Sequence, residues 1–358
     1  MRLNPELYSP EKPLVTVVIY NYNYGRYLRE CFESVLAQTY ENTEICFSDN
    51  ASTDDSWDIA LEYQKKYPDV FFIARNRKNF GSDANLRNCS VNIRGKYFVY
   101  LCSDDALKPD FIRMCVEGLE AHPDTAFAMV HRTIIDEHGQ HVEEPSFYNQ
   151  TCKIPGASQA AVYMMAAVNP AISQIMYRGS LVYNKGVIGG LAARWYGTRL
   201  MDFNICCEHP IIYIREPLML HRLHQSNDSA KATENLLEAV CPYILNFQYA
   251  EMASAYGHKK VVERLPAATH KIAQLSLRYC LRSLNSGNET TAKRYWHLAA
   301  AFDPNVADST NYRLVSEYWE TTDDNKCLIL NKLNADEGQL ARRHSYDPPA
   351  DAVSLTFC

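Results

Sequence analysis

Short hydrophobic runs alternate with amphipathic segments over the first third of the chain. Residues 14–19 are apolar at all positions but one, which is typical of a strand buried on both faces. Residues 26–38 place their apolar side chains on one helical stripe. The same alternation predicts further strands at residues 45–47, 70–73 and 97–101, and helices from residue 52 or 53 to 67, at 81–93 and from 109 to 122. This rhythm predicts an α/β fold, a Rossmann-like and mostly parallel sheet covered by helices on both faces.

The second part of the chain is less regular. Residues 138–155 lose the periodicity and predict a long loop, functional or mobile. Ser52 or Thr53 is a suitable N-cap for the second helix of the first part. Strands are expected at residues 172–177 and 211–214, with helices at 179–188 and 201–207; beyond Ser229 helices are expected at 232–255, 267–284, 290–302 and 312–320. We therefore predict an α/β domain over residues 1–229 and a helical C-terminal region over residues 230–358.

Composition and charge narrow the possible functions. The 358 residues include 36 Lys and Arg against 42 Asp and Glu, a net charge of −6 without basic runs, so nucleic acid is not expected as a partner. No apolar run is long enough to cross a bilayer, and the first residues lack the apolar core of a signal peptide. The 12 cysteines are scattered without a C-x-x-C pair and predict free, mostly buried thiols. These features predict a cytoplasmic protein, with peripheral contact to the inner face of a membrane left open.

Polar residues follow each of the first four predicted strands. Open parallel sheets bind ligands beyond the carboxyl ends of their strands, so these positions are candidates for a binding site. Asp104 and Asp105 follow the strand at residues 97–101. Adjacent carboxylates repel each other unless a cation lies beside them, and Mg²⁺ or Mn²⁺ typically pairs such groups with substrate phosphates. Capping of the helix that begins near Pro109 is the alternative.

Seven segments, in this order, resemble the signatures of the family 2 inverting glycosyltransferases. They lie at residues 17–23, 34–40, 48–55, 101–109, 201–203, 216–218 and 222–229. The resemblance covers about residues 13–229 and implies the A-type glycosyltransferase fold. It also implies a nucleotide diphosphate-sugar donor, a UDP-sugar being favoured, and a glycan or glycolipid acceptor in bacterial-type surface polysaccharide assembly.

The resemblance assigns a nucleoside pocket to the first three strand ends. Asp49 matches the acidic position that contacts the uracil or ribose, and Tyr22 matches an aromatic position near the base. Arg75 and Asp83 lie in the stretch that completes the pocket. The alternatives are an Asx-type turn before Ser52 for Asp49, core packing for Tyr22 and solvated loop charges for the other two.

The fourth strand end resembles the metal-binding motif of the family. Asp104 matches the last aspartate of a D-x-D motif, which holds Mg²⁺ or Mn²⁺ against the diphosphate. Cys102 stands where the first acidic residue is usual and Ser103 stands in the middle, which puts metal affinity in doubt. By the same resemblance Ser103 lies among the nucleotide-binding residues. Asp105 is expected to bind the sugar or water.

The last segments of the resemblance supply the remaining roles. Asp202 matches the catalytic aspartate, although the usual glutamate before it is Met201 here. It would act as the base that deprotonates the acceptor hydroxyl; a plain helix N-cap is the alternative for Asp202, and Glu208 is the second candidate base. His224 matches a histidine in a closing loop that reaches the metal or diphosphate, with an ordinary surface or core histidine as its alternative, and Arg222 is placed to neutralise the leaving diphosphate.

Two other functions compete with glycosyl transfer. A sugar nucleotidyltransferase would need a Gly-rich loop after the first strand to hold a triphosphate, and residues 20–24 do not supply one. A degenerate transferase domain acting as a binding or scaffold protein is the second alternative, in which the departure at Cys102 marks a lost activity. The helical region is expected to serve acceptor docking, homo-oligomerisation or attachment to a membrane face.

Overall fold

A computed structural model describes residues 12–142, 144–165, 170–182, 198–224, 232–337 and 344–357. These residues divide into two compact units. The first unit contains residues up to 159, residues 170–224 and the C-terminal stretch from residue 344; the second contains residues 160–165 and 232–337. The C-terminal stretch therefore returns to the first unit, which a boundary near Ser229 does not anticipate.

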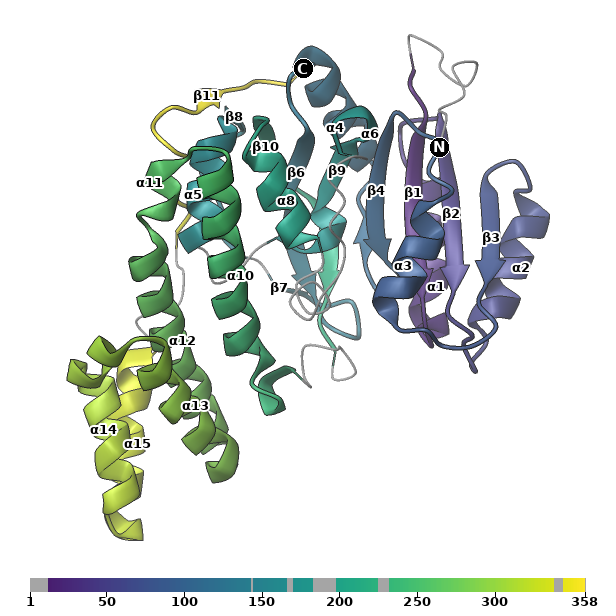
Figure 1. Cartoon of the computed structure of the whole chain (residues 1–358). Helices are drawn as coiled ribbons and strands as arrows, with labels where there is room; N and C mark the ends of the chain where they lie inside the picture. The colour runs from purple at the N-terminus through teal and green to yellow at the C-terminus, as the bar shows by residue number, and fades with distance from the viewer. Residues whose placement is uncertain are drawn as a thin grey trace. The chain divides into compact units, whose positions relative to one another are not determined.

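The first unit is built on one mixed sheet of 11 strands in the described residues. Its strands are β1 (Val15–Asn21), β2 (Thr43–Asp49), β3 (Phe71–Arg75), β4 (Tyr97–Cys102), β5 (Ala106–Leu107), β6 (Phe127–Ile135), β7 (His141–Val142), β8 (Cys152–Ile154), β9 (Ile175–Arg178), β10 (Ile211–Arg222) and β11 (Val353–Ser354). The main order is β11-β8-β10-β6-β9-β4-β1-β2-β3, with β5 on β10 and β7 on β6 (Figure 1). Strands β4, β1, β2 and β3 are mutually parallel, and β10 runs parallel to β6.

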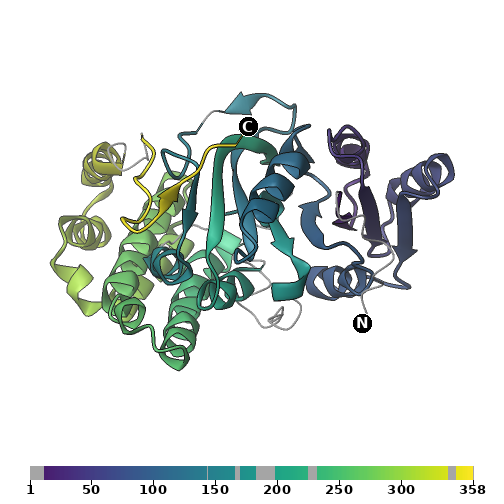
Figure 2. The same cartoon turned by 90° about the horizontal axis from the view of Figure 1, so that it is seen from above.

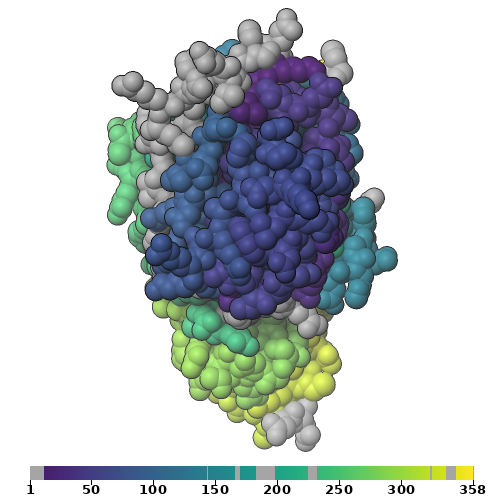
Figure 3. All heavy atoms as spheres, turned by 90° about the vertical axis from the view of Figure 1, so that its right-hand side faces the viewer, coloured from purple at the N-terminus to yellow at the C-terminus, as the bar shows by residue number. Residues whose placement is uncertain are grey.

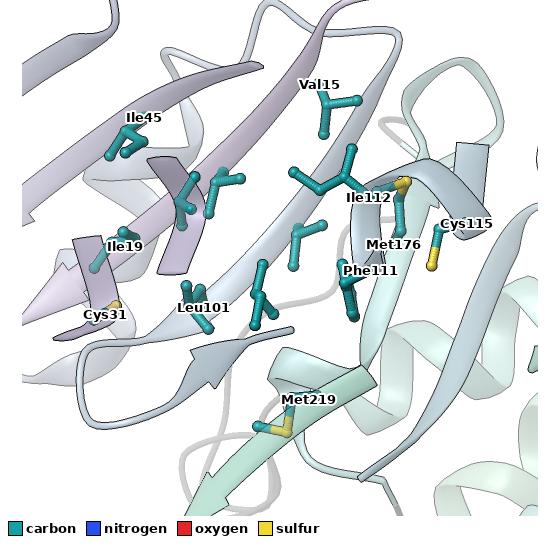
Figure 4. Packing of buried hydrophobic residues seen from close by; sticks show 14 of the residues in the cluster. Val15, Ile19, Cys31, Ile45, Leu101, Phe111, Ile112, Cys115, Met176 and Met219 are labelled. Carbon is teal, nitrogen blue, oxygen red and sulfur yellow. The ribbon is translucent and has the colours of Figure 1, made fainter. Parts of the chain in front are cut away.

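Helices cover both faces of the parallel part of this sheet. The helices of the first unit are α1 (Gly25–Leu36), α2 (Ser56–Lys66), α3 (Ser82–Ser90), α4 (Phe111–Ala121), α6 (Gly179–Val182) and α8 (Arg199–Cys206), and α5 (Gly156–Met165) begins in it. Side chains of α1, α2 and α4 belong to the same hydrophobic core as Val15, Val17 and Ile19 of β1. Figure 4 shows part of this core, with Val15, Ile19 and Phe111 among the labelled residues. Helix α3 packs against β1 and β2 through the buried Cys89, whose thiol lies 2.9 Å from the carbonyl oxygen of Cys46.

The expected α/β architecture is confirmed, with differences at particular elements. Helix α2 begins at Ser56 with Asp55 as its N-cap, so the prediction that Ser52 or Thr53 caps it is wrong. The stretch at residues 138–155 is not wholly a loop, because β7 and β8 lie in it, and residues 172–174 form a 3₁₀ turn before β9. Strand β6 was not predicted. The helix expected at residues 179–188 is described only as α6, and the rest lies outside the described residues.

Backbone pairing brings distant segments together at both ends of the sheet. β11, near the C-terminus, pairs with β8, which in turn pairs with β10 (Figure 2). At the opposite end of the sheet, β3 is the last strand in the order. It belongs to the N-terminal part of the chain, which forms the purple to blue surface of Figure 3. The candidate site lies at the carboxyl ends of strands between these two edges.

The second unit is helical, as expected. Its helices are α10 (Leu237–Ala255), α11 (Lys259–Val262), α12 (Leu265–Asn285), α13 (Glu289–Phe302), α14 (Thr310–Glu320) and α15 (Asp323–Glu337). Helices α12, α13 and α14 share a core that includes Leu281, Tyr295 and Val315. Helix α15 was not predicted.

Two expectations about the whole chain can be compared with the described residues. All 11 cysteines described there are free, and only Cys327 is exposed, as the scattered pattern predicts. None of the helices described combines the length and the apolar character that a membrane span requires.

Gly156 lies against the backbone at the end of α8, and this close contact predicts that a larger residue there destabilises the fold. A Cβ atom on Gly156 would lie 2.2 Å from the carbonyl oxygens of Cys206 and His209, which belong to the backbone and cannot rotate away. Gly156→Ala should therefore lower the free energy of unfolding by about 3 kcal/mol, at the upper end of the usual cost of overpacking. Thermal unfolding measures this. Gly118→Ala is the control, because its nearest atoms are side-chain carbons of Phe357 and Ile212 at 3.0 and 3.3 Å; an equal loss in both variants would contradict the argument.

Candidate active site

The polar strand ends identified in the sequence meet at one edge of the sheet. In the parallel register Asn21 of β1 pairs with Asp49 of β2, and Asp49 pairs with Arg75 of β3. On the other side Tyr20 pairs with Cys102 of β4. Because the strands are parallel, the loops that follow them leave the sheet on the same side. The four predicted strand-end segments therefore lie along the same edge of the sheet.

Asp49 lies at the centre of the nucleoside end of this site. Its side chain is fully buried, and Oδ2 accepts a hydrogen bond from the backbone N–H of Ser52 at 2.9 Å. Oδ1 accepts from the hydroxyl of Ser52 and from Nδ2 of Asn21 at 3.1 Å. The Asx-type turn considered as the alternative for Asp49 is therefore present, and it fixes the carboxylate at the strand end.

The structure places the other predicted nucleoside residues differently from one another. Nε of Arg75 lies 3.3 Å from Oδ2 of Asp49, and its guanidinium group is centred 5.5 Å from the ring of Trp57. Tyr22 is 41% exposed, so the core-packing alternative does not hold for it. Asp83 is partly exposed in the first turn of α3. Arg75 and Asp49 thus form a pair, in which Asp49 is buried and Arg75, like Tyr22, is exposed.

A group of asparagines that the sequence analysis did not select supports the same loops. Nδ2 of Asn50 donates to Oδ1 of Asn79 at 2.8 Å, while Nδ2 of Asn76 donates to Asn50 and Asn85 at 2.9 and 3.0 Å. Asn85 in turn donates to the carbonyl oxygen of Ser48 at 3.1 Å. The network joins β2, the loop after β3 and α3. Asparagine is common in turns, so the sequence carried no signal that separated these residues from ordinary loop residues.

The fourth strand end brings several potential ligand atoms together. One atom each from Cys102, Asp104 and Asp105 lies within 4.8 Å of the others. The thiol of Cys102 also lies 3.2 Å from the hydroxyl of Tyr20. Ser103 lies between the two positions that match the ends of the D-x-D motif, and it is 2% exposed.

Asp104 and His224, both predicted as metal ligands, are in contact. Nε2 of His224 lies 3.1 Å from Oδ2 of Asp104, and the imidazole is fully buried between the rings of Tyr24 and Tyr27, at centroid distances of 5.3 and 5.1 Å. Burial raises the pKa of Asp104, and the hydrogen bond from His224 opposes that rise. A carboxylate and an imidazole at this spacing are both potential ligands of a divalent cation.

Asp105 and Arg222 make more protein contacts than the sequence suggested. Asp105 is 2% exposed, and both of its oxygens accept hydrogen bonds from protein groups. Arg222 is 3% exposed; it donates to the carbonyl oxygens of Asp104 and Asp136 at 3.0 and 3.1 Å and to Oε2 of Glu30 at 2.6 Å. The guanidinium of Arg222 therefore braces the turn that carries Asp104.

Asp202 lies in the first turn of α8 and is 3% exposed. Thr198 is the N-cap residue of α8, so the alternative that Asp202 is the N-cap is wrong. Oδ1 of Asp202 accepts from the hydroxyl of Tyr177 at 2.6 Å, and Oδ2 accepts from the hydroxyl of Thr198 at 3.0 Å. Burial raises the pKa of Asp202 to about 7, although both hydrogen bonds lower it. Such a pKa suits a base working near neutral pH; Glu208, the second candidate, is exposed after the end of α8.

The raised pKa of Asp202 has a consequence for stability. The folded protein keeps this proton up to a pKa of about 7, whereas the unfolded chain releases it near the ordinary value of 3.8. Between about pH 4 and pH 7 the folded state therefore binds more protons, and this carboxyl lowers the free energy of unfolding as the pH rises. Asp202→Asn removes the titration. We expect the variant to gain stability over the unmodified protein from pH 4 to pH 7, measured by denaturant unfolding; a difference that does not change with pH would contradict the raised pKa.

Comparison with known proteins agrees with the geometry. Residues 16–165 match the family model described as Glycosyl transferase family 2. The chondroitin synthase of Escherichia coli is 39% identical over 123 residues, which cover 34% of this chain and 17% of that protein. An uncharacterized glycosyltransferase of a Nostoc species is 27% identical over 219 residues, 61% of this chain and 67% of that one. The putative glycosyltransferase EpsE of Bacillus subtilis is 33% identical over 127 residues, 36% of this chain and 46% of that one. The chain thus spans less than half the length of two of these three relatives.

Solved structures are similar in fold over most of the chain. TarS of S. aureus, in complex with UDP-GlcNAc, superposes with a TM-score of 0.54 at 15% identity. The match covers 86% of this chain and 91% of the TarS chain. A mannosyltransferase from Pyrobaculum calidifontis, in complex with GDP-Man and Mn²⁺, gives a TM-score of 0.50 at 14% identity. The match covers 91% of this chain and 88% of the mannosyltransferase chain. The A-type glycosyltransferase fold implied by the sequence resemblance is thereby confirmed.

Proposed function

We propose that this chain, whose residues 16–165 match glycosyl transferase family 2 and which has the A-type glycosyltransferase fold, is a glycosyltransferase of that family. It transfers a sugar from a UDP-sugar to a hydroxyl of a glycan or glycolipid acceptor, with inversion. The observation that carries the proposal is the meeting of two pairs at the carboxyl ends of parallel strands. Asp49 and Arg75 form one pair, and Asp104 and His224 form the other. The first would hold the nucleoside and the second the diphosphate.

The nucleoside half of the donor site uses fixed polar groups. Asp49 is held in one orientation by Ser52 and Asn21, and it would accept a hydrogen bond from a ribose hydroxyl or a base N–H. Arg75, which is 41% exposed at its side chain, retains solvent contact beside it. Tyr22 offers an exposed aromatic ring at the same edge, suited to stacking on a base.

The diphosphate half of the donor site would stabilise the negative charge that develops on the diphosphate when its bond to the sugar breaks. Asp104 and His224 would hold Mn²⁺ or Mg²⁺, which supplies neutralisation of the leaving diphosphate. The guanidinium of Arg222 donates to the carbonyl oxygen of Asp104 at 3.0 Å and adds positive charge to the same region. Ser103 lies in the turn between the metal position and β4.

Asp202 would complete the reaction as the general base. Its carboxylate would take the proton of the acceptor hydroxyl as that oxygen attacks the anomeric carbon, on the face opposite the diphosphate. Tyr177 and Thr198 hold the carboxylate by two hydroxyl hydrogen bonds, which fixes its orientation. The departing nucleotide and the base would then act on opposite faces, as inversion requires.

The relatives support particular parts of this proposal. TarS binds UDP-GlcNAc, and the Pyrobaculum mannosyltransferase binds GDP-Man together with Mn²⁺. The name of the chondroitin synthase denotes synthesis of a polysaccharide. Together they favour a nucleotide-sugar donor, a divalent cation and a role in surface polysaccharide assembly for this chain. A cytoplasmic location, and acceptor docking, oligomerisation or membrane contact by the helical region, remain predictions.

A binding or scaffold protein built on a transferase domain is the second candidate. Cys102 favours it, because a partly buried thiol replaces the first carboxylate of the motif. Burial raises the pKa of this thiol, and the neighbouring carboxylates raise it further, so it does not replace the missing negative charge. Such a protein would bind a nucleotide sugar without consuming it.

Thermal unfolding with a panel of nucleotide sugars, with and without Mn²⁺, tests donor binding. A ligand that binds only the folded state raises the melting temperature by mass action. We expect UDP-sugars to stabilise the protein, and more strongly with Mn²⁺ than without it. If CDP-, GDP- and UDP-sugars all fail to raise the melting temperature under both conditions, the proposed donor site is wrong.

A further inference from the structure

A buried serine outside the predicted site makes two hydrogen bonds to the turn that carries Asp104. Ser173 lies in the 3₁₀ turn η2 (Ile172–Gln174) and is 0% exposed. Its hydroxyl donates to Oδ2 of Asp105 at 2.7 Å and accepts from the backbone N–H of Cys102 at 3.0 Å. A serine hydroxyl has one proton and two lone pairs, so both bonds form at once.

Asp105 extends this connection to the end of β10. Its Oδ1 accepts from the backbone N–H of Arg222 at 3.0 Å and lies 3.2 Å from Nδ1 of His221. Arg222 is the last residue of β10, and His224 follows it by two residues. The chain of contacts therefore runs from η2 through the carboxylate of Asp105 to the segment that brings His224 against Asp104.

We propose that Ser173 is a positioning residue of the metal site, which acts through Asp105 to set the spacing between Asp104 and His224. The inference rests on the proposed function, in which those two side chains hold the divalent cation. The hydroxyl of Ser173 gives its one proton to Asp105 and accepts from the N–H of Cys102, so it acts through the carboxylate of Asp105. Loss of partners that orient metal ligands typically costs about 10- to 100-fold in metal affinity. Asp105, expected from the sequence to bind the sugar, would be a structural link of the same kind.

Ser173→Ala removes both hydrogen bonds and adds no new group. We expect the affinity for Mn²⁺ in the presence of UDP, measured by calorimetry on the full chain, to fall by about 10- to 100-fold. The affinity for UDP without metal should stay the same, because the Asp49 pocket makes no contact with Ser173 among the described residues. A merely structural role would not separate these two affinities.

Thr16 provides a matched control, because it lies at the start of β1 and the candidate site lies at the other end of that strand. Its hydroxyl donates to Oε1 of Glu44 at 2.6 Å and accepts from the backbone N–H of Gly95 at 2.9 Å, and the residue is 0% exposed. It thus joins a carboxylate to a backbone N–H as Ser173 does. Thr16→Val should lower the melting temperature to a similar extent as Ser173→Ala and leave the affinity for Mn²⁺ unchanged.

Asp105→Asn is the second variant, and it keeps the test decisive if Ser173→Ala does not fold. UDP lacks the sugar that is transferred, so weaker Mn²⁺-dependent binding of UDP by Asp105→Asn supports the positioning role. A loss confined to the sugar-bearing donor assigns Asp105 to the sugar and overturns the inference.

If the unmodified protein shows Mn²⁺-dependent binding and Ser173→Ala binds Mn²⁺ as Thr16→Val does, the inference is wrong and the proposed function stands. If the unmodified protein shows no Mn²⁺ effect, the proposed metal site itself is wrong, and the inference falls with it.

Discussion

Replacement of Asp202 by asparagine is expected to lower the rate of sugar transfer by roughly 10²- to 10⁴-fold, the usual range for loss of a general base. Asparagine keeps the shape of the side chain and can still accept from Tyr177 at Oδ1, but it has no site for the acceptor proton. Donor affinity should barely change, because the nucleotide contacts come from Asp49 and Asp104 at strand ends, whereas Asp202 lies in α8. Steady-state kinetics, with donor binding measured separately, gives both values.

Glu208→Gln is the matched control for the base. Glu208 lies six positions after Asp202 and is exposed, so its replacement should leave the rate near that of the unmodified protein. A near-normal rate for Asp202→Asn would remove Asp202 from the role of base. A large loss for Glu208→Gln in the same assay would assign the role to Glu208.

The second large effect is expected at Asp104. Asp104→Ala should abolish the enhancement of UDP binding by Mn²⁺, because it removes the carboxylate whose Oδ2 lies 3.1 Å from Nε2 of His224. The measurement is calorimetric titration of UDP with and without Mn²⁺. Binding of UDP without metal should persist through the Asp49 and Arg75 pair.

Asp110→Ala is the control for loss of a nearby carboxylate. Asp110 lies at the start of α4 and interacts with Thr39 and Arg113. Its replacement should leave the Mn²⁺ enhancement intact. An enhancement that persists in Asp104→Ala would place the metal elsewhere in the protein.

Local patterns in the sequence were sufficient for the parallel half of the fold and for the strand-end position of the site. Strands β1 to β4 are short apolar runs, each followed by polar residues, so hydrophobicity and turn chemistry indicate the same elements. β6 was missed because His131, Arg132 and Thr133 interrupt its apolar pattern. In the structure His131 and Thr133 are nevertheless buried, with His131 Nε2 3.1 Å from the carbonyl oxygen of Glu144.

Contacts between distant segments could not be read from the sequence. Ser52 has the side chain of a helix cap, yet its hydroxyl and N–H bind Asp49, because the loop continues to Ser56 before α2 begins. Ser173 lies in an ordinary apolar stretch, and only the pairing of β9 with β4 brings it to Asp105. The return of the C-terminal stretch to the sheet depends in the same way on the pairing of β11 with β8. The roles assigned to the site residues stay predictions until they are tested by substitution.

Donor hydrolysis tests the central claim most directly, because water can replace the unidentified acceptor. The unmodified protein, incubated with Mn²⁺ and the UDP-α-sugar that stabilises it most, should release UDP slowly. Proton NMR, recorded before the anomers equilibrate, should show the free sugar first as the β-anomer. Release should be lost in both Asp104→Ala and Asp202→Asn. Tight binding of the donor without any release of UDP, or first appearance of the α-anomer, would contradict the assignment of this chain as an inverting glycosyltransferase.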